Sequence, residues 1–232
     1  MPTRKKLVVL SGAGISAESG LRTFREMGGL WEEYDIMEVA SPHAWEKDPE
    51  LVTKFYNDRR KQLFNCHPND GHLILHQLEE HFNVEIITQN VDDLHERAGS
   101  TKVLHLHGEL RKARSTIDAN LIYELDDWEL TADSKCEKGS RLRPHIVWFG
   151  EEVPAISEAV EIVSRADLLI VVGTSMNVYP AAGLIDYTPS NCPIYIIDPN
   201  EINMSSYGNR IFIKDKASIG MKELYQKLVP NL

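Results

Sequence analysis

The spacing that carries the clearest chemistry is Gly12-Ala13-Gly14-Ile15-Ser16-Ala17, in which two glycines and a small residue follow the pattern G-x-G-x-x-A. It comes directly after four apolar residues at 7–10, which are typical of a strand buried on both faces of a parallel sheet. In a dinucleotide-binding turn the glycines permit a tight turn and a close approach to a pyrophosphate, and the small residue lets a helix start near the strand. The same pattern also fits an ordinary glycine-rich turn between a strand and a helix.

Two features beside this turn differ from those of a dehydrogenase. A dehydrogenase places an acid at the end of the second strand, about 20 residues further on, to hold a ribose. Residues 28–34 read Gly-Gly-Leu-Trp-Glu-Glu-Tyr, which does not predict a strand. Thr23-Phe24-Arg25 follows the glycines instead, and an aromatic ring and a guanidinium beside a nucleotide loop indicate a lid over the ligand.

The remaining chain alternates apolar runs with amphipathic segments, which predicts an α/β fold with a parallel sheet. We expect strands at 84–88, 103–107, 168–172, 193–197 and 211–213, and helices at 71–82, around 156–163 and around 221–228. Another helix could begin at Pro49 with Asp48 as its N-cap and run through residues 55–60. Ligands in such sheets lie beyond the carboxyl ends of the strands. Small or polar residues follow four of the strands: Gly12 and Gly14; Gln89, Asn90 and Asp92; Gly173, Thr174 and Ser175; Asp198 and Asn200. Because four separate strands end in residues of this kind, the sequence favours a nucleotide site at the carboxyl edge of the sheet.

Composition limits the possible partners. The chain of 232 residues has 25 basic and 35 acidic side chains, a formal charge of −10, which argues against nucleic acid as the main partner. The acidic balance is compatible with binding basic peptides, although a solvated acidic surface is the simpler explanation and the one we favour. Three scattered cysteines favour a reducing compartment. Without a signal-like or membrane-spanning run, we predict a cytoplasmic protein that does not use a membrane.

Seven motifs, in the order in which they occur, resemble those of the sirtuins, NAD-dependent protein lysine deacylases. They are Gly-Ala-Gly-Ile-Ser (12–16), Thr-Phe-Arg (23–25), Gly-Gly-Leu-Trp (28–31), Thr-Gln-Asn-Val-Asp (88–92), Leu-His-Gly (106–108), Trp-Phe-Gly-Glu (148–151) and Gly-Thr-Ser (173–175). They span nearly the whole chain. The sequence is most similar to the short bacterial and mitochondrial class that removes acidic acyl groups.

The resemblance implies a Rossmann-like NAD-binding domain with a smaller inserted lobe. We assign residues 1–27, 68–108 and 153–232 to the first, and the helical segment 28–67 with 109–152 to the second. The polar stretch 111–143, which lacks a clear period, corresponds to the position of a zinc ribbon. The expected partners are acylated lysine peptides or proteins, and we expect a monomer.

The resemblance also implies a reaction. The acyl-lysine carbonyl oxygen attacks C1′ of the nicotinamide ribose, nicotinamide leaves, and the acyl group ends on ADP-ribose. His107 would be the general base on the ribose hydroxyls, which suits an imidazole because its pKa lies near neutrality. Asn90 and Asp92 would assist cleavage, although Gln-Asn-Val-Asp-Asp alone also fits a strand-end turn with a helix cap. A metal held by His105 and His107 on one side of a strand is a competing reading, weakened by the lack of further ligands.

Further residues match family contacts to the cofactor. Phe24 and Arg25 would close over NAD and exclude water. Asp198 stands where the family usually has asparagine, and a carboxylate can also accept from ribose hydroxyls. The full expected cofactor set is Gly12, Ala13, Gly14, Ile15, Ala17, Glu18, Thr23, Phe24, Arg25, Trp31, Gln89, Asn90, Asp92, Gly173, Thr174, Ser175, Asp198, Asn200 and Ala217.

The expected substrate residues include Tyr56 and Arg59, which lie three residues apart and hence on one helix face. In the family this pair marks the class that removes negatively charged acyl groups, since arginine can bind a carboxylate with two bonds and tyrosine can add a hydroxyl. We therefore predict succinyl, malonyl or glutaryl lysine, with acetyl as a weaker or parallel substrate. A solvated basic face continuing through Arg60 and Lys61 is the alternative. The other expected substrate residues are Ala40, Val147, Gly150, Glu151 and Val178, with 150–151 and 177–179 enclosing the peptide as an added strand.

The small lobe departs from the family. Sirtuins usually carry two C-x-x-C pairs there, whereas this chain retains only Cys136. Because one thiolate cannot form a closed structural zinc site, we predict no zinc. Packing of Ile117, Leu121, Tyr123 and Trp128 is expected to hold the lobe instead.

Three other activities remain open on the sequence. One is an NAD hydrolase or ADP-ribosyl transferase that uses the same site without a peptide. A hydride-transfer enzyme is disfavoured because Tyr-x-x-x-Lys and the ribose acid are both lacking. The third is a non-enzymatic NAD sensor, which is disfavoured because a sensor has no need of a base such as His107 at the end of a strand.

Overall fold

The larger part of the molecule is built on a parallel sheet. The computed structural model describes residues 4–21, 35–200 and 209–229, and within them six strands lie in the order β3-β2-β1-β7-β8-β9. Their bounds are β1 Lys6–Ser11, β2 Asn83–Thr88, β3 Val103–His105, β7 Leu168–Val172, β8 Ile194–Ile197 and β9 Arg210–Ile213. The strand order reverses between β1 and β7, the point at which open α/β sheets bind ligands.

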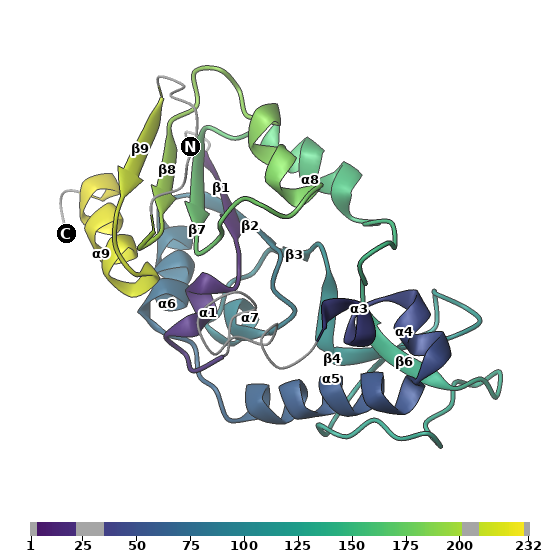
Figure 1. The fold of residues 1–232 in the computed structure, drawn as a ribbon. Coiled ribbons are helices and arrows are strands. Elements are labelled where there is room, and N and C mark those ends of the chain that lie inside the picture. The colour runs from purple at the N-terminus through teal and green to yellow at the C-terminus, as the bar shows by residue number, and fades with distance from the viewer. Residues whose placement is uncertain (1–3, 22–34, 201–208, 230–232) are drawn as a thin grey trace.

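Helices cover both faces of this sheet (Figure 1). One layer contains α6 Asp70–Gln77, the 3-10 helix η1 Leu78–Glu80 and α9 Ala217–Leu228; the other contains α8 Ile156–Val163 and the 3-10 helix η2 Ala181–Tyr187. Alternate residues of β1 enter different cores, because Leu7 and Val9 pack with the first layer and Val8 and Leu10 with the second. Burial on both sides explains the unbroken apolar run.

The smaller lobe combines two stretches that are separated in the sequence. Helices α3 Ile36–Val39, α4 Pro42–Lys47 and α5 Pro49–Phe64 come from the first. The second forms an antiparallel sheet in the order β5-β4-β6, with bounds β4 Gly108–Ser115, β5 Ile122–Glu124 and β6 Leu142–Ile146. Phe55, Leu63, Leu110 and Trp148 belong to one apolar cluster that joins the two stretches. The fold class is therefore confirmed, while the exact residue limits of the two domains stay a prediction.

Helix α5 begins where its sequence predicts. The Asp48 carboxylate accepts a hydrogen bond from the Leu51 amide at 2.9 Å, and Pro49 occupies the first helical turn. Arg60 is fully buried and donates to the carbonyl oxygens of Leu110 and Trp128. Arg60 therefore ties α5 to the antiparallel sheet, and the alternative of a solvated basic face through this residue is wrong.

The core of the antiparallel lobe differs in part from the predicted one. Its buried members are Ala113, Leu130, Cys136 and Leu142, and Leu121 and Tyr123 pack against them as predicted. Ile117, however, is 66% exposed in the turn after β4. Trp128 lies against α5, where the Lys61 ammonium is 4.8 Å from the centre of its ring. Both residues were expected in the lobe core, because the stretch 111–143 has no clear period that would show which of its apolar residues are exposed.

Two predicted elements end earlier than expected. The strand predicted at 103–107 stops at His105, because the chain turns at Gly108 (φ +81°) to enter β4. A side chain at Gly108 would collide with the carbonyl of His145 on β6. The helix predicted at 71–82 ends at Gln77 and continues as η1. Among the described residues, no helix is long and apolar enough to cross a membrane.

Candidate active site

The β1–α1 turn and the end of β7 meet at the switch point of the sheet. The Gly14 amide donates to the Gly173 carbonyl at 2.8 Å. A Cβ at Gly12 would lie 2.7 Å from that of Thr174, and one at Gly14 would lie 2.8 Å from the Gly173 Cα. These glycines are therefore needed for the two loops to touch, a reason that the sequence did not give. Helix α1 (Gly14–Ala17) is a single turn, with Ile15 buried and Ala17 half-buried.

The next strand end brings Asn90 and Asp92 together through Ser16. The Ser16 hydroxyl donates to Asp92 Oδ2 at 3.0 Å and accepts from Asn90 Nδ2 at 3.2 Å. Asn90 and Asp92 are each 6% exposed. Burial raises the pKa of Asp92, opposed by hydrogen bonds from the Leu94 amide and Ser16. Sequence reasoning did not select Ser16, although it lies inside the glycine-rich motif.

His107 lies in the link between β3 and β4, beside the same strand end. Its Nδ1 is 3.1 Å from the carbonyl oxygen of Gln89. A carbonyl can only accept, so Nδ1 carries the proton and Nε2 keeps a free lone pair. Burial lowers the pKa of His107, so the neutral, basic form dominates at neutral pH. Gln89 in turn donates from Nε2 to Thr174 Oγ1 at 3.1 Å, which connects the ends of β2 and β7.

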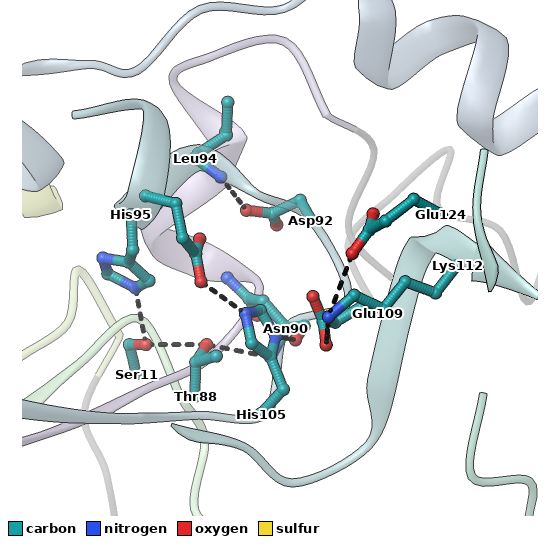
Figure 2. A network of polar contacts seen from close by, with 11 residues as sticks. Ser11, Thr88, Asn90, Asp92, Leu94, His95, His105, Glu109, Lys112 and Glu124 are labelled. Atoms are coloured by element: carbon teal, nitrogen blue, oxygen red, sulfur yellow. Dashed lines mark hydrogen bonds and ion pairs between the residues drawn. The ribbon is translucent and has the colours of Figure 1, made fainter. Parts of the chain in front are cut away.

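His105 does not pair with His107 as a metal ligand. Its Nδ1 lies 2.9 Å from the Asn90 carbonyl oxygen and its Nε2 lies 2.8 Å from a Glu96 carboxylate oxygen. Figure 2 shows His105 among these polar groups, directed toward Asn90. Although burial opposes it, the bond to Glu96 raises the pKa of His105. Both ring nitrogens thus face acceptors, and neither is left to bind a metal.

A buried polar network that sequence reasoning missed includes Ser11, Thr88 and His95, which lie beside these residues (Figure 2). Ser11 Oγ donates to Thr88 Oγ1 and is 2.9 Å from Nε2 of His95. His72 lies 3.4 Å from Ser16 Oγ, with its ring centre 5.0 Å from that of His95. Burial lowers the pKa of His72 to about 4 and that of His95 well below its usual value. The only sequence signal was a hydroxyl residue at the end of each of two strands, Ser11 on β1 and Thr88 on β2.

The remaining predicted cofactor residues differ in their surroundings: some are buried or hydrogen-bonded, and others are exposed or lie outside the described residues. Asp198, at the end of β8, is buried and accepts from the Asn200 amide at 2.9 Å. The Glu18 carboxylate accepts from the amide and hydroxyl of Ser218 at 3.0 and 2.8 Å, which holds the start of α9 beside α1. Ala217, the first residue of α9, is buried. Ala13 is half-buried and Ser175 is exposed, while Thr23, Phe24, Arg25 and Trp31 lie outside the described residues.

The predicted acyl pair lies on the inward face of α5. Tyr56 is 4% exposed, Arg59 is half-buried, and Ala40 is buried near them in the same lobe. Burial raises the pKa of Tyr56 to about 12 and lowers that of Arg59 to about 10, which leaves both groups protonated at neutral pH. Trp148, which was not selected as a site residue, donates from Nε1 to Tyr56 Oη at 3.1 Å.

The residues predicted to hold the peptide come from two loops. The Val147 amide donates to the His107 carbonyl at 2.9 Å, so this loop lies directly beside the candidate base. Gly150 has φ +92°, and Val178 is half-buried in the loop after β7. The Glu151 carboxylate is fully engaged, because it pairs with Arg114 at 3.1 Å and Arg143 at 2.8 Å. Its side chain therefore shapes the loop, and since its amide donates to the Trp148 carbonyl, only its backbone carbonyl is left for an added strand.

The antiparallel lobe is closed by polar contacts where a zinc ribbon would carry its ligands. Thr116 Oγ1 lies 2.5 Å from Ser140 Oγ, and Lys138 pairs with Asp118 at 2.7 Å. Cys136 is buried in the lobe core. In the part of the chain that the structure describes, no group of three or more potential ligands is arranged to hold a metal. The absence of zinc stays a prediction.

The strand order, the glycine contacts at the switch point and the polar strand ends define a dinucleotide-binding α/β protein with an inserted lobe. Residues 12–180 match the model of the Sir2 family. Two "NAD-dependent protein deacylase" relatives come from Helicobacter pylori strain J99 and from Bacteroides thetaiotaomicron. The Helicobacter pylori protein is 54% identical to this chain, and the match covers 97% of this chain and 96% of the relative. The Bacteroides thetaiotaomicron protein is 50% identical, and the match covers 97% of this chain and 99% of the relative.

A solved structure of a Sir2 homologue mutant in complex with ADP-ribose is 43% identical, with a TM-score of 0.90 over 99% of this chain and 95% of that one. The chain belongs to the Sir2 family.

Proposed function

We propose that this protein is an NAD-dependent protein lysine deacylase that prefers acidic acyl groups. Membership of the Sir2 family and the name shared by relatives of about full length support the activity. The observation that carries the proposal is the placement of His107. Its Nδ1 is occupied by the Gln89 carbonyl, and its Nε2 lone pair is left beside the strand end that holds Asn90 and Asp92.

The residues present fit NAD. The loops at Gly12, Gly14 and Gly173 touch so closely that no side chain fits between them, so the switch point there is formed by backbone, as the close approach of a pyrophosphate requires. When bound, NAD would supply a ribose carbon that loses nicotinamide and accepts the acyl oxygen. The other expected cofactor contacts remain part of this proposal.

The protein's own groups divide the remaining tasks. We assign to the Nε2 of His107 the removal of a proton from a ribose hydroxyl, which its neutral form can accept. Asn90 and Asp92 would orient the nicotinamide ribose, since Ser16 fixes both side chains. The loops around Val147 and Val178 would hold an acylated lysine peptide as an added strand.

We further propose that the acyl end is succinyl, malonyl or glutaryl, because Tyr56 and Arg59 offer a buried hydroxyl and a guanidinium on one helix face. A hydroxyl and a guanidinium together match a carboxylate, which has only acceptors. An acetyl group lacks that partner and is expected to be the weaker substrate.

One assay tests the activity and its alternatives. The protein is incubated with NAD and a succinylated, acetylated or unmodified peptide of one sequence, and nicotinamide, acyl-ADP-ribose and free lysine are measured. The proposal predicts all three products with the succinylated peptide, and fewer with the acetylated one. Nicotinamide release that does not depend on an acylated peptide would instead indicate an NAD hydrolase.

The acyl preference has its own variant. Arg59→Met should lower the ratio of succinyl to acetyl kcat/KM by at least tenfold, because a charged hydrogen bond is lost. Lys61→Met removes an exposed cation from the same helix and is the matched control, for which the ratio should not change.

A further inference from the structure

The structure fixes the direction of a hydrogen bond at the Tyr56 hydroxyl. Nε1 of Trp148 lies 3.1 Å from Tyr56 Oη, and the two side chains are 2% and 4% exposed. An indole N–H can only donate, so the phenol oxygen is the acceptor in this bond. The phenol proton must therefore be given to a different acceptor.

Tyr56 keeps that proton at neutral pH. Burial raises the pKa of Tyr56 to about 12, although the nearby Arg59 acts in the opposite direction. Arg59 follows one turn later on α5 and also has only donors. Tyr56 and Arg59 thus present donors from one face of α5, and a ligand carboxylate has the matching chemistry.

The orientation of Trp148 is itself fixed from the antiparallel lobe. The guanidinium carbon of Arg143 lies 3.3 Å from the centre of the Trp148 ring, and the ring of Trp45 lies 5.8 Å away. Glu151 accepts from the Trp148 amide at 2.8 Å and pairs with Arg143 at 2.8 Å. The indole cannot turn away from Tyr56 without disturbing these contacts.

We propose that Trp148 is a positioning residue for acidic acyl groups. Its indole N–H holds the Tyr56 phenol so that the phenol proton is directed to the carboxylate at the end of the acyl chain. Arg143 and Glu151 hold the indole in turn. This inference rests on the proposed deacylation of acidic acyl-lysines, and it assigns Trp148 to recognition of the acyl end and not to the chemistry at His107.

The test compares Trp148→Phe, which keeps a ring but removes the N–H, with Tyr56→Phe. Steady-state rates are measured with succinylated and acetylated peptides of one sequence. Loss of one neutral hydrogen bond should lower the ratio of succinyl to acetyl kcat/KM about fivefold in each variant, mainly through KM. In the double variant the two effects should not add, because both changes act on one contact.

Equal losses on both peptides would show that Trp148 acts only through folding, and an unchanged ratio would show that its N–H does not matter. Either result overturns the inference. If Trp148→Phe does not fold, 3-benzothienylalanine placed at position 148 keeps the shape of indole without the N–H and gives the same comparison.

The wild-type protein and Arg59→Met separate this inference from the proposed function. If wild type prefers acetyl-lysine and Arg59→Met leaves the ratio unchanged, the proposed acyl preference fails, and the role of Trp148 fails with it. If wild type prefers succinyl-lysine and Arg59→Met removes that preference, a normal ratio in Trp148→Phe overturns the role of Trp148 alone.

Discussion

His105 and His107 bind the carbonyl oxygens of two consecutive residues, Asn90 and Gln89, through their Nδ1 atoms at 2.9 and 3.1 Å. The two imidazoles differ in what faces Nε2. In His105 that nitrogen is 2.8 Å from Glu96, and the pair raises the pKa of His105. In His107 burial lowers the pKa. One strand end thus holds two imidazoles whose pKa values are shifted in opposite directions.

The first prediction concerns the pH dependence of the reaction. The pKa of His107 is lowered from its usual value of 6.5, so the base form persists as the pH falls toward that value. We expect kcat/KM for the succinylated peptide to stay level through neutral pH and to fall only below about pH 6.5. An acid limb with its midpoint above pH 7 would contradict a buried, neutral His107.

The second prediction concerns stability at low pH. The folded protein keeps His72 neutral until about pH 4, whereas the unfolded chain takes up that proton near pH 6.5. The unfolded state therefore binds more protons between these values, and stability is lost as the pH falls through them. We expect a loss of about 2 kcal/mol between pH 6.5 and 5 from this residue, measured by urea unfolding.

His72→Gln should show a shallower dependence on pH over the same range. His43→Gln replaces an exposed imidazole on α4 and serves as the control. If the free energy of unfolding changed with pH equally in His72→Gln and in wild type, His72 would not be the cause of the lost stability.

The third prediction compares two glycines with positive φ. A side chain at Gly173 (φ +63°) would collide with the Ile15 amide at the switch point, whereas Gly139 (φ +77°) has open space around it. Gly139→Ala should cost only the backbone strain, about 1–2 kcal/mol in urea unfolding. Gly173→Ala should cost more and should also raise the KM for NAD. Equal costs with an unchanged KM would show that this contact does not shape the cofactor site.

The fourth prediction concerns zinc. The lobe is closed by hydrogen bonds and an ion pair such as Lys138–Asp118 around a small apolar core. We expect elemental analysis to find less than about 0.1 zinc per chain, and EDTA to leave the melting temperature unchanged. Stoichiometric zinc, or unfolding by the chelator, would show that ligands other than paired cysteines hold a metal.

The sequence predicted the elements whose local signals agree with the fold. Asp48 and Pro49 marked the start of α5, and unbroken apolar runs marked β1 and β7, because both faces of these strands are buried. Spacing on α5 also placed Tyr56 and Arg59 on one face. These features depend on neighbours in the chain and are visible without tertiary structure.

Features that depend on distant neighbours were missed or misplaced. The strand predicted at 103–107 ends at His105, because the chain turns at Gly108, where a side chain would collide with the His145 carbonyl on β6. Trp148 and Tyr56 are 92 residues apart, so no pattern could show their bond. Ile117 was expected inside because it is apolar, and only the turn after β4 exposes it.

The most direct test of the account is the rate of deacylation by His107→Asn. The asparagine Nδ2 can still donate to the Gln89 carbonyl, so the variant removes the base while it retains the local contact. With saturating NAD and succinylated peptide, and with folding verified by circular dichroism, we predict a fall in kcat of at least about 100-fold. A folded His107→Asn protein that releases free lysine at the wild-type rate would contradict the account.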